Sequence, residues 1–162
     1  MLVVHREILR FLVGLPWEIR AGRSTETKMK KHSLTYWKKK AWKAFSTWVR
    51  TNELDDDGNA TCYTCGIKKH WKKMYAGHFV QGRRPSVLIQ EEIVKVQCVG
   101  CNRFRHGNLN KFTPMMIEEL GLARVLWWFK RAEQSVEVTA EEYIKLYKVY
   151  GRLVKERGIE LE

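Results

Sequence analysis

Residues 62–102 decide the fold of this chain, and they read CYTCGIKKHWKKMYAGHFVQGRRPSVLIQEEIVKVQCVGCN. The stretch is bounded by two Cys-x-x-Cys pairs, Cys62 with Cys65 and Cys98 with Cys101. Each pair makes a tight turn that presents two thiolates on one side, so two pairs converge readily on one tetrahedral ion. An even number of cysteines also permits disulfides, but nothing marks the chain as secreted and cytosolic thiols stay reduced. The spacing therefore predicts a four-cysteine zinc site.

A zinc ion held by four thiolates has no open coordination position, so its role is structural. The ion joins two segments that are distant in the sequence, and it stabilises a small domain that lacks a large hydrophobic core. Function then lies between the clamps, where His78 and Asn102 stand out. A histidine of near-neutral pKa can take a proton from water, and an asparagine carbonyl is a hard oxygen ligand that Mg²⁺ accepts. Together they suit metal-assisted phosphodiester hydrolysis, although each alone is also typical of a packing histidine or a helix-capping asparagine.

Composition bounds the class of protein. A chain of 162 residues that is 44% hydrophobic can fold as one domain with a packed core. No apolar run approaches the roughly 18 residues of a membrane span, so we expect a soluble, cytoplasmic protein with no membrane partner. Lys and Arg number 30 against 18 acidic residues, which leaves a net charge of +12. The basic excess lies in residues 1–111, and it predicts a polyanionic partner, most commonly nucleic acid.

Patterning divides the chain into three parts. Residues 1–28 form an N-terminal extension of unknown role. Residues 29–112 contain a basic helix, from an N-cap at Ser33 to Arg50, and the zinc-clamped core. Within that core, Val94 and Val96 alternate with polar residues, as in a half-buried strand. Residues 113–162 are helical, with a Thr113 N-cap before the first of these helices and a capping box at Thr139. Their aromatic stripes favour core packing or a dimer contact.

Several motifs together resemble a known family. The chain resembles the zinc-bearing HNH, or ββα-metal, endonucleases, and among them it is most similar to the lambdoid phage NinG (Rap) recombination family. The resemblance covers about residues 33–121. The motifs that carry it are Lys39-Lys40-Ala41-Trp42, Cys62-Tyr-Thr-Cys65-Gly66, His70-Trp71-Lys72, Ala76-Gly77-His78-Phe79, Gln97-Cys98-x-x-Cys101-Asn102 and Gly107-Asn108-Leu109. Phage endonuclease VII is similar in having an asparagine directly after its last zinc cysteine.

The resemblance implies an α+β fold in which a small zinc-clamped ββα-metal (HNH-like) centre is embedded in a mainly helical domain. It implies a structure-specific DNA endonuclease that cuts branched recombination intermediates such as Holliday junctions and D-loops. The enzyme would be encoded by a phage or prophage, act in the cytoplasm of a bacterial host, and work as a homodimer. His78 would be the general base, and Asn102 would be a ligand of a catalytic Mg²⁺ or Mn²⁺.

Two positions depart from the HNH pattern. Gly77 stands where these enzymes usually carry an acidic or histidine ligand, and Ile93 stands where the central asparagine would fall. The second protein ligand of the catalytic ion is therefore open. We rank Asp57 first, because a carboxylate binds Mg²⁺ better than an imidazole does. The remaining candidates are Asp56, His70, Glu92, His106 and Asn108, and the ion could instead be held largely by substrate phosphate and water.

DNA contacts are expected to be made to phosphates, since junction enzymes read shape rather than sequence. The candidate contacts are Arg83, Arg84, Lys68, Lys69, Lys72, Arg103, Arg105, Lys39 and Lys40. Two other functions remain open at this point. One is a non-catalytic zinc-knuckle nucleic-acid-binding protein, which Gly77 and Ile93 favour. The other is an RNA-binding or regulatory module, which the basic and aromatic residues 67–79 would suit.

Overall fold

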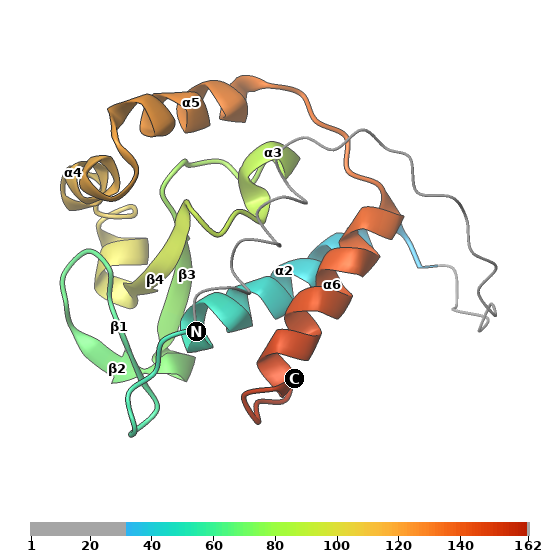
Figure 1. Ribbon diagram of the computed structural model, residues 1–162, viewed down its shortest axis with the longest axis horizontal. Helices are drawn as coiled ribbons and strands as arrows, with labels where there is room; N and C mark the ends of the chain where they lie inside the picture. The colour runs from blue at the N-terminus through green and yellow to red at the C-terminus, as the bar shows by residue number, and fades with distance from the viewer. Residues whose placement is uncertain (1–31, 162) are drawn as a thin grey trace. The chain divides into compact units, whose positions relative to one another are not determined.

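The computed structural model describes residues 32–161, so the expected extension 1–28 lies outside the described residues. The fold is α+β, as expected, and its helices and strands are arranged around a small antiparallel hairpin (Figure 1). In chain order the elements are α2 (Leu34–Thr51), β1 (Asn59–Thr61), β2 (Lys68–His70), η1 (Trp71–Lys73), β3 (Met74–His78), α3 (Pro85–Leu88), β4 (Val94–Cys98), η2 (Gly100–Phe104), α4 (Leu109–Leu120), α5 (Leu122–Glu133) and α6 (Ala140–Lys155).

The hairpin formed by β3 and β4 separates the cysteines from His78. Met74 pairs with Cys98 at one end, and His78 pairs with Val94 at the other. Four residue-to-residue steps of about 3.3 Å separate these ends by about 13 Å. A second hairpin, β1 with β2, carries the first cysteine pair in its loop. The cysteines therefore gather at the Met74 end of β3, while His78 stands at the opposite end.

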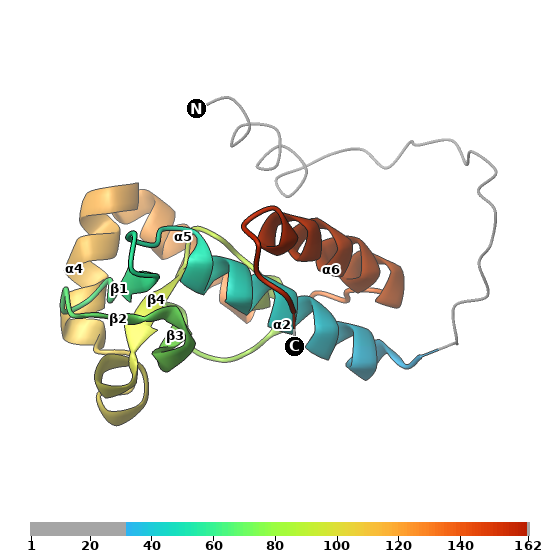
Figure 2. The same ribbon diagram turned by 90° about the horizontal axis from the view of Figure 1, so that it is seen from below.

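Helices α2 and α6 lie side by side, and α2 packs against one face of the β3–β4 hairpin (Figures 1 and 2). The start of α2 confirms the predicted N-cap, because the hydroxyl of Ser33 accepts the backbone N–H of Tyr36 at 3.3 Å. The start of α6 confirms the capping box, with Thr139 and Glu142 bonding each other's backbone. Phe45 of α2 meets Tyr150 of α6 edge-on, and both rings are fully buried. The aromatic stripe of α6 is therefore core.

A second core lies under α3, α4 and α5 and includes Phe112 and Met116. The predicted helix start at Thr113 was wrong. Helix α4 begins at Leu109, and Thr113 lies inside it. The cause is a left-handed turn at Asn108 (φ 53°), whose carbonyl accepts the N–H groups of residues 111 and 112. Starting the helix there buries the whole Phe112 ring. That burial outweighs the backbone hydrogen bond lost at Pro114 inside the helix.

The helices within residues 32–161 are all too short or too polar to cross a lipid bilayer.

Candidate active site

The four cysteines meet in one cluster at the end of the hairpin. Their sulfur atoms all lie within 4.8 Å of one another, and no disulfide joins them. The sulfurs of Cys65 and Cys98 are 3.8 Å apart. Two thiolates on a tetrahedral zinc ion, each about 2.3 Å from it, stand at about that separation. The predicted gathering of the cysteines is confirmed, and their geometry fits a structural zinc ion.

Local backbone geometry brings the cysteines together. Gly66 adopts a positive φ of 73°, and its N–H bonds the carbonyl of Cys62 at 2.8 Å, which closes the first turn. Strand β4 delivers Cys98, and the π-helical turn η2 delivers Cys101. The Asn108 amide donates to the sulfur of Cys101 at 3.5 Å. Such outer contacts orient metal ligands.

The cysteine thiols differ in acidity. Burial acts to raise the pKa of Cys62, but hydrogen bonds from the backbone of Cys98 and from Thr64 outweigh it and lower that pKa to about 6. Burial raises the pKa of Cys65 to about 12, and the neighbouring cysteines add to the effect. A metal ion must displace the proton of each thiol that it binds. Of these two thiols, Cys62 therefore gives up its proton to a metal ion more readily than Cys65.

The His78 side chain is held on two sides at the end of β3. Its ring stacks on Trp42 of α2, with centroids 4.9 Å apart and planes at 19°. Its Nε2 atom lies 2.9 Å from the backbone carbonyl oxygen of Leu88. A carbonyl oxygen can only accept, so Nε2 carries the proton and donates it. In the neutral ring this leaves Nδ1 with a lone pair that can accept a proton from water.

Electrostatics keep His78 in that neutral form. Burial lowers its pKa from the usual value, and the positive charge of Arg83 lowers it further, while the bond to Leu88 acts in the opposite direction. The guanidinium group of Arg83 stands over the Trp42 ring, 4.8 Å from its centroid. Trp42 therefore contacts both the candidate base and the nearest cation. At neutral pH His78 is poised to accept a proton rather than to donate one.

The structure brings Asn102 beside the residue that precedes His78. A Cβ atom built on Gly77 would lie only 3.1 Å from the Asn102 Oδ1 atom. Asn102 belongs to η2 and directly follows Cys101, so the cysteine cluster fixes its position. The two residues that the sequence singled out thus reach the same end of β3 from separate segments.

Two of the alternative metal ligands are engaged elsewhere. The Glu92 carboxylate accepts two hydrogen bonds from Arg124, at 2.9 and 3.0 Å, and one from the Trp128 indole at 2.7 Å. Asn108 is bonded to the sulfur of Cys101. Glu92 could bind an ion only by giving up some of these contacts, whereas the Asn108 bond uses only the amide nitrogen.

The other candidate ligands are exposed side chains. Asp56 and Asp57 are exposed in the turn before β1, and β1 pairs with β2 at His70. His70 is exposed, and its Nδ1 atom accepts the backbone N–H of residue 72. His106 is also exposed. Asp57 as a second ligand of the catalytic ion therefore stays a prediction.

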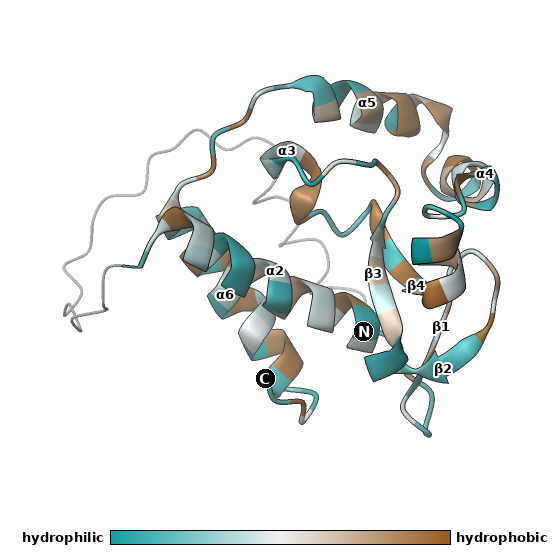
Figure 3. Ribbon diagram, turned by 180° about the vertical axis from the view of Figure 1, so that it is seen from behind, coloured by the Kyte–Doolittle hydropathy of each residue, from teal (hydrophilic) through white to brown (hydrophobic). Residues whose placement is uncertain are grey.

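The predicted DNA-contact residues fall into two groups. The first group makes contacts within the protein. The Arg84 guanidinium donates to the carbonyl of Ala132 at 2.8 Å, and Lys68 forms an ion pair with Asp55 at 3.4 Å. The others present their charge near the site or to solvent, and β2 with the turn after it is strongly hydrophilic (Figure 3). This second group comprises Arg83, Lys69, Lys72, Arg103, Arg105, Lys39 and Lys40.

Sequence reasoning missed the environment of Gln97. The alternation in β4 treated it as an outward polar residue, yet its side chain is fully buried. Its Nε2 atom donates to the Thr64 hydroxyl at 3.2 Å and to the Gly107 carbonyl at 2.7 Å. Its position directly before Cys98 was the one signal in the sequence that could have drawn attention to it.

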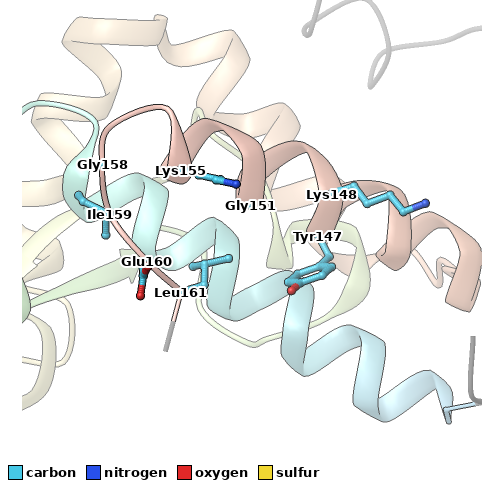
Figure 4. A pocket seen from close by; sticks show the side chains of 8 residues that line it. All are labelled: Tyr147, Lys148, Gly151, Lys155, Gly158, Ile159, Glu160 and Leu161. Carbon is cyan, nitrogen blue, oxygen red and sulfur yellow. The ribbon is translucent and has the colours of Figure 1, made fainter.

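A pocket of about 610 Å³ lies elsewhere, between the second half of α6 and the chain that follows it (Figure 4). Tyr147, Gly151 and Leu161 are among the residues that line it, and none of the site residues above does. It therefore has no part in the arrangement around His78.

Comparisons with known proteins place the chain in a family. The family model described as bacteriophage lambda NinG protein matches residues 18–160. Protein ninG of Salmonella phage P22 is 32% identical over 94 residues, which are 56% of this chain and 43% of that protein. Protein ninG of Escherichia phage lambda is 29% identical over 90 residues, which are 54% of this chain and 41% of that protein. The matched region thus covers less than half the length of either relative, and no solved structure matches the chain. Because the family match extends over most of the sequence, the chain belongs to the bacteriophage lambda NinG protein family.

Proposed function

We propose that this protein is a metal-dependent DNA endonuclease that cuts branched recombination intermediates of the Holliday-junction or D-loop type. The observation that carries the proposal is the end of β3, where the His78 contact with Leu88 through Nε2 leaves Nδ1 as the acceptor nitrogen and Asn102 presents an oxygen beside Gly77. We further propose that the hairpin β3–β4 with η2 is an HNH-like ββα-metal centre related to that of phage endonuclease VII. The enzyme would act in the cytoplasm of the bacterial host of a phage or prophage.

The chemistry assigns one role to each residue. Asn102 would help to hold a Mg²⁺ or Mn²⁺ ion, which when bound stabilises the charge on the phosphate and on the leaving 3′ oxygen. The Nδ1 atom of His78 accepts the proton of the attacking water, while its Nε2 atom stays bonded to Leu88. Stacking on Trp42 keeps the ring in that orientation. The four cysteines hold a structural zinc ion that fixes η2, and with it Asn102.

DNA would bind through its phosphates. Arg83 stands beside the candidate base and is placed to hold the scissile strand. Arg103 and Arg105 flank Phe104, whose side chain is 78% exposed in the turn that carries Asn102. A cationic surface with one projecting ring suits an unpaired or distorted strand. This arrangement supports a preference for branched over linear DNA.

A second copy of the chain is required for symmetric cutting of a four-way junction, which needs two active sites. In α5 the apolar side chains of Leu122, Leu126 and Phe129 are exposed, whereas the aromatic stripe of α6 is buried. We therefore place the dimer contact on α5. Light scattering is expected to show a dimer at micromolar concentration that Leu126→Glu converts to a monomer. A wild-type monomer that junction DNA leaves unchanged would contradict this assignment.

The alternative is a zinc-stabilised nucleic-acid-binding protein without catalysis. Two observations favour it: Gly77 carries no ligand atom, and Ile93 is fully buried in the second core. The test uses a labelled four-way junction and a linear duplex of matched sequence, each with Mg²⁺, with Mn²⁺ and with a chelator. The endonuclease proposal expects cutting of the junction that depends on the metal ion and exceeds cutting of the duplex. Tight binding without cutting in either metal would establish the alternative.

The pH dependence of cleavage should report the environment of His78. The base works only when neutral, and burial together with Arg83 lowers its pKa. The single-turnover cleavage rate should therefore rise with pH through a midpoint below 6.5, the ordinary value of histidine, and be level at neutral pH. Arg83→Gln removes a charge that opposes protonation, so it should move the midpoint to higher pH.

The matched control is Arg84→Gln. This neighbouring arginine bonds the Ala132 carbonyl and does not perturb the histidine. Its substitution should lower thermal stability and leave the midpoint of the profile in place. An Arg83→Gln profile that superimposes on the wild type would show that another group sets the pH dependence.

A further inference from the structure

Gly77 allows the Gln97 side chain to occupy the space that a side chain at position 77 would fill. A Cβ atom on Gly77 would overlap the Gln97 Oε1 atom and lie 2.8 Å from the Cδ atom of the same amide. Residues Gly77 and Gln97 share one face of the hairpin, since Gln97 pairs with Tyr75 two residues earlier on β3. The amide of β4 therefore covers the glycine of β3.

The orientation of the Gln97 amide follows from its partners. The Gly107 carbonyl, 2.7 Å away, can only accept, so the atom that faces it is the nitrogen. The oxygen consequently points toward Gly77. That Oε1 atom is buried and has no hydrogen-bond partner among residues 32–161. A buried amide oxygen without a partner is uncommon in folded proteins and calls for one.

A second oxygen reaches the same place. The Asn102 Oδ1 atom lies 3.1 Å from the position that a Gly77 Cβ would take, on the side where Gln97 Oε1 stands. Two carbonyl-type oxygens thus converge on a glycine, and the next residue along the chain is His78. Neutral amide oxygens are ligands that Mg²⁺ and Mn²⁺ accept.

We propose that Gln97 Oε1 and Asn102 Oδ1 together form the protein part of the divalent-cation site, and that Gly77 is required because a side chain there would displace Gln97. The cation is the one invoked by the proposed function, and on that function this inference rests. Gln97 takes the position in space that an acidic residue before the base would otherwise reach. Asp57 is then not needed as a ligand.

The test measures Mn²⁺ binding to the full-length, zinc-loaded protein by the loss of the free-ion signal in electron paramagnetic resonance. Gln97→Ala should weaken binding at least about tenfold. Gly77→Asp/Gln97→Ala should restore it, because the new carboxylate enters the space that Gln97 has left. Gln81→Ala is the matched control, since Gln81 also donates to a backbone carbonyl of the same loop, that of His106 at 3.0 Å. Zinc content and thermal melting should remain near wild type in each variant used.

The outcomes separate this inference from the proposed function. Weak Mn²⁺ binding in Gln97→Ala that the double variant restores supports the cation site, whether or not the protein cuts DNA. Wild-type Mn²⁺ binding in Gln97→Ala overturns it, even where the wild type cleaves junctions. Loss in Gln97→Ala without rescue in the double variant also overturns it, because Gln97 would then act only through its hydrogen bonds to Thr64 and Gly107.

Discussion

Removing zinc from the four-cysteine site is expected to unfold the region between the two cysteine pairs. The core around these cysteines is small, and it includes Ala60 and Met74 besides the cysteines themselves. Structural zinc contributes about 10–16 kcal/mol in small zinc domains, which is as large as the whole stability of a typical domain. Each kcal/mol of lost unfolding free energy lowers Tm by about 2–4 °C in a domain of this size. Even a loss of about 5 kcal/mol therefore lowers Tm by at least about 10 °C. Calorimetry with and without a chelator, together with one zinc per chain by mass spectrometry, measures this.

Cys65→Ser isolates the metal from packing. Cys65 is the exposed member of the cluster, while the other three are buried. Its substitution removes one ligand and disturbs no core contact. Added zinc should return the chelated wild type to its original Tm and should fail to do so for Cys65→Ser. A zinc-free wild type that melts at the same temperature as the loaded protein would show that the cluster is not a structural metal site.

Local signals predicted the parts of the fold that local forces determine. Ser33 and Thr139 cap helices whose first turns need only a side-chain acceptor, so their positions could be read from the sequence. Strand β3 offered no such signal, because alanine and glycine at its centre have little intrinsic preference for a strand. It forms because β4 supplies its hydrogen-bond partners. The Thr113–Pro114 signal for a helix start was wrong, since burial of Phe112 favours an earlier start at Asn108.

In the candidate site, too, local spacing could be read from the sequence and tertiary contacts could not. The spacing of the cysteines predicted their cluster, and Asn102 lies directly after Cys101 in the sequence. The environment of Gln97 could not be predicted, because alternation locates a polar residue on the solvent side only when one face of a strand is covered. Here β4 is covered on both faces, by α2 on one and by Thr64 and Gly107 on the other. The significance of Gly77 likewise becomes visible only with the amide lying over it.

Substitution of His78 is expected to have the largest effect on catalysis. Loss of a general base typically lowers the rate of the chemical step by about 10²–10⁴-fold. His78→Ala should show this loss, and so should His78→Gln, whose amide can still donate to the Leu88 carbonyl but cannot take the proton from water. His32→Ala is the control, because His32 is an exposed histidine just before α2 that is not among the candidate ligands. Its single-turnover cleavage rate should stay within about twofold of wild type.

The most direct test of the proposed function is cleavage of a labelled four-way junction by zinc-loaded wild type and His78→Ala, in Mg²⁺ and in Mn²⁺, with binding of the same junction measured in parallel. We expect both proteins to bind the junction and only the wild type to cut it. Equal cutting by the two proteins would contradict the role of His78. Binding by the wild type without cutting in either metal would contradict the endonuclease itself.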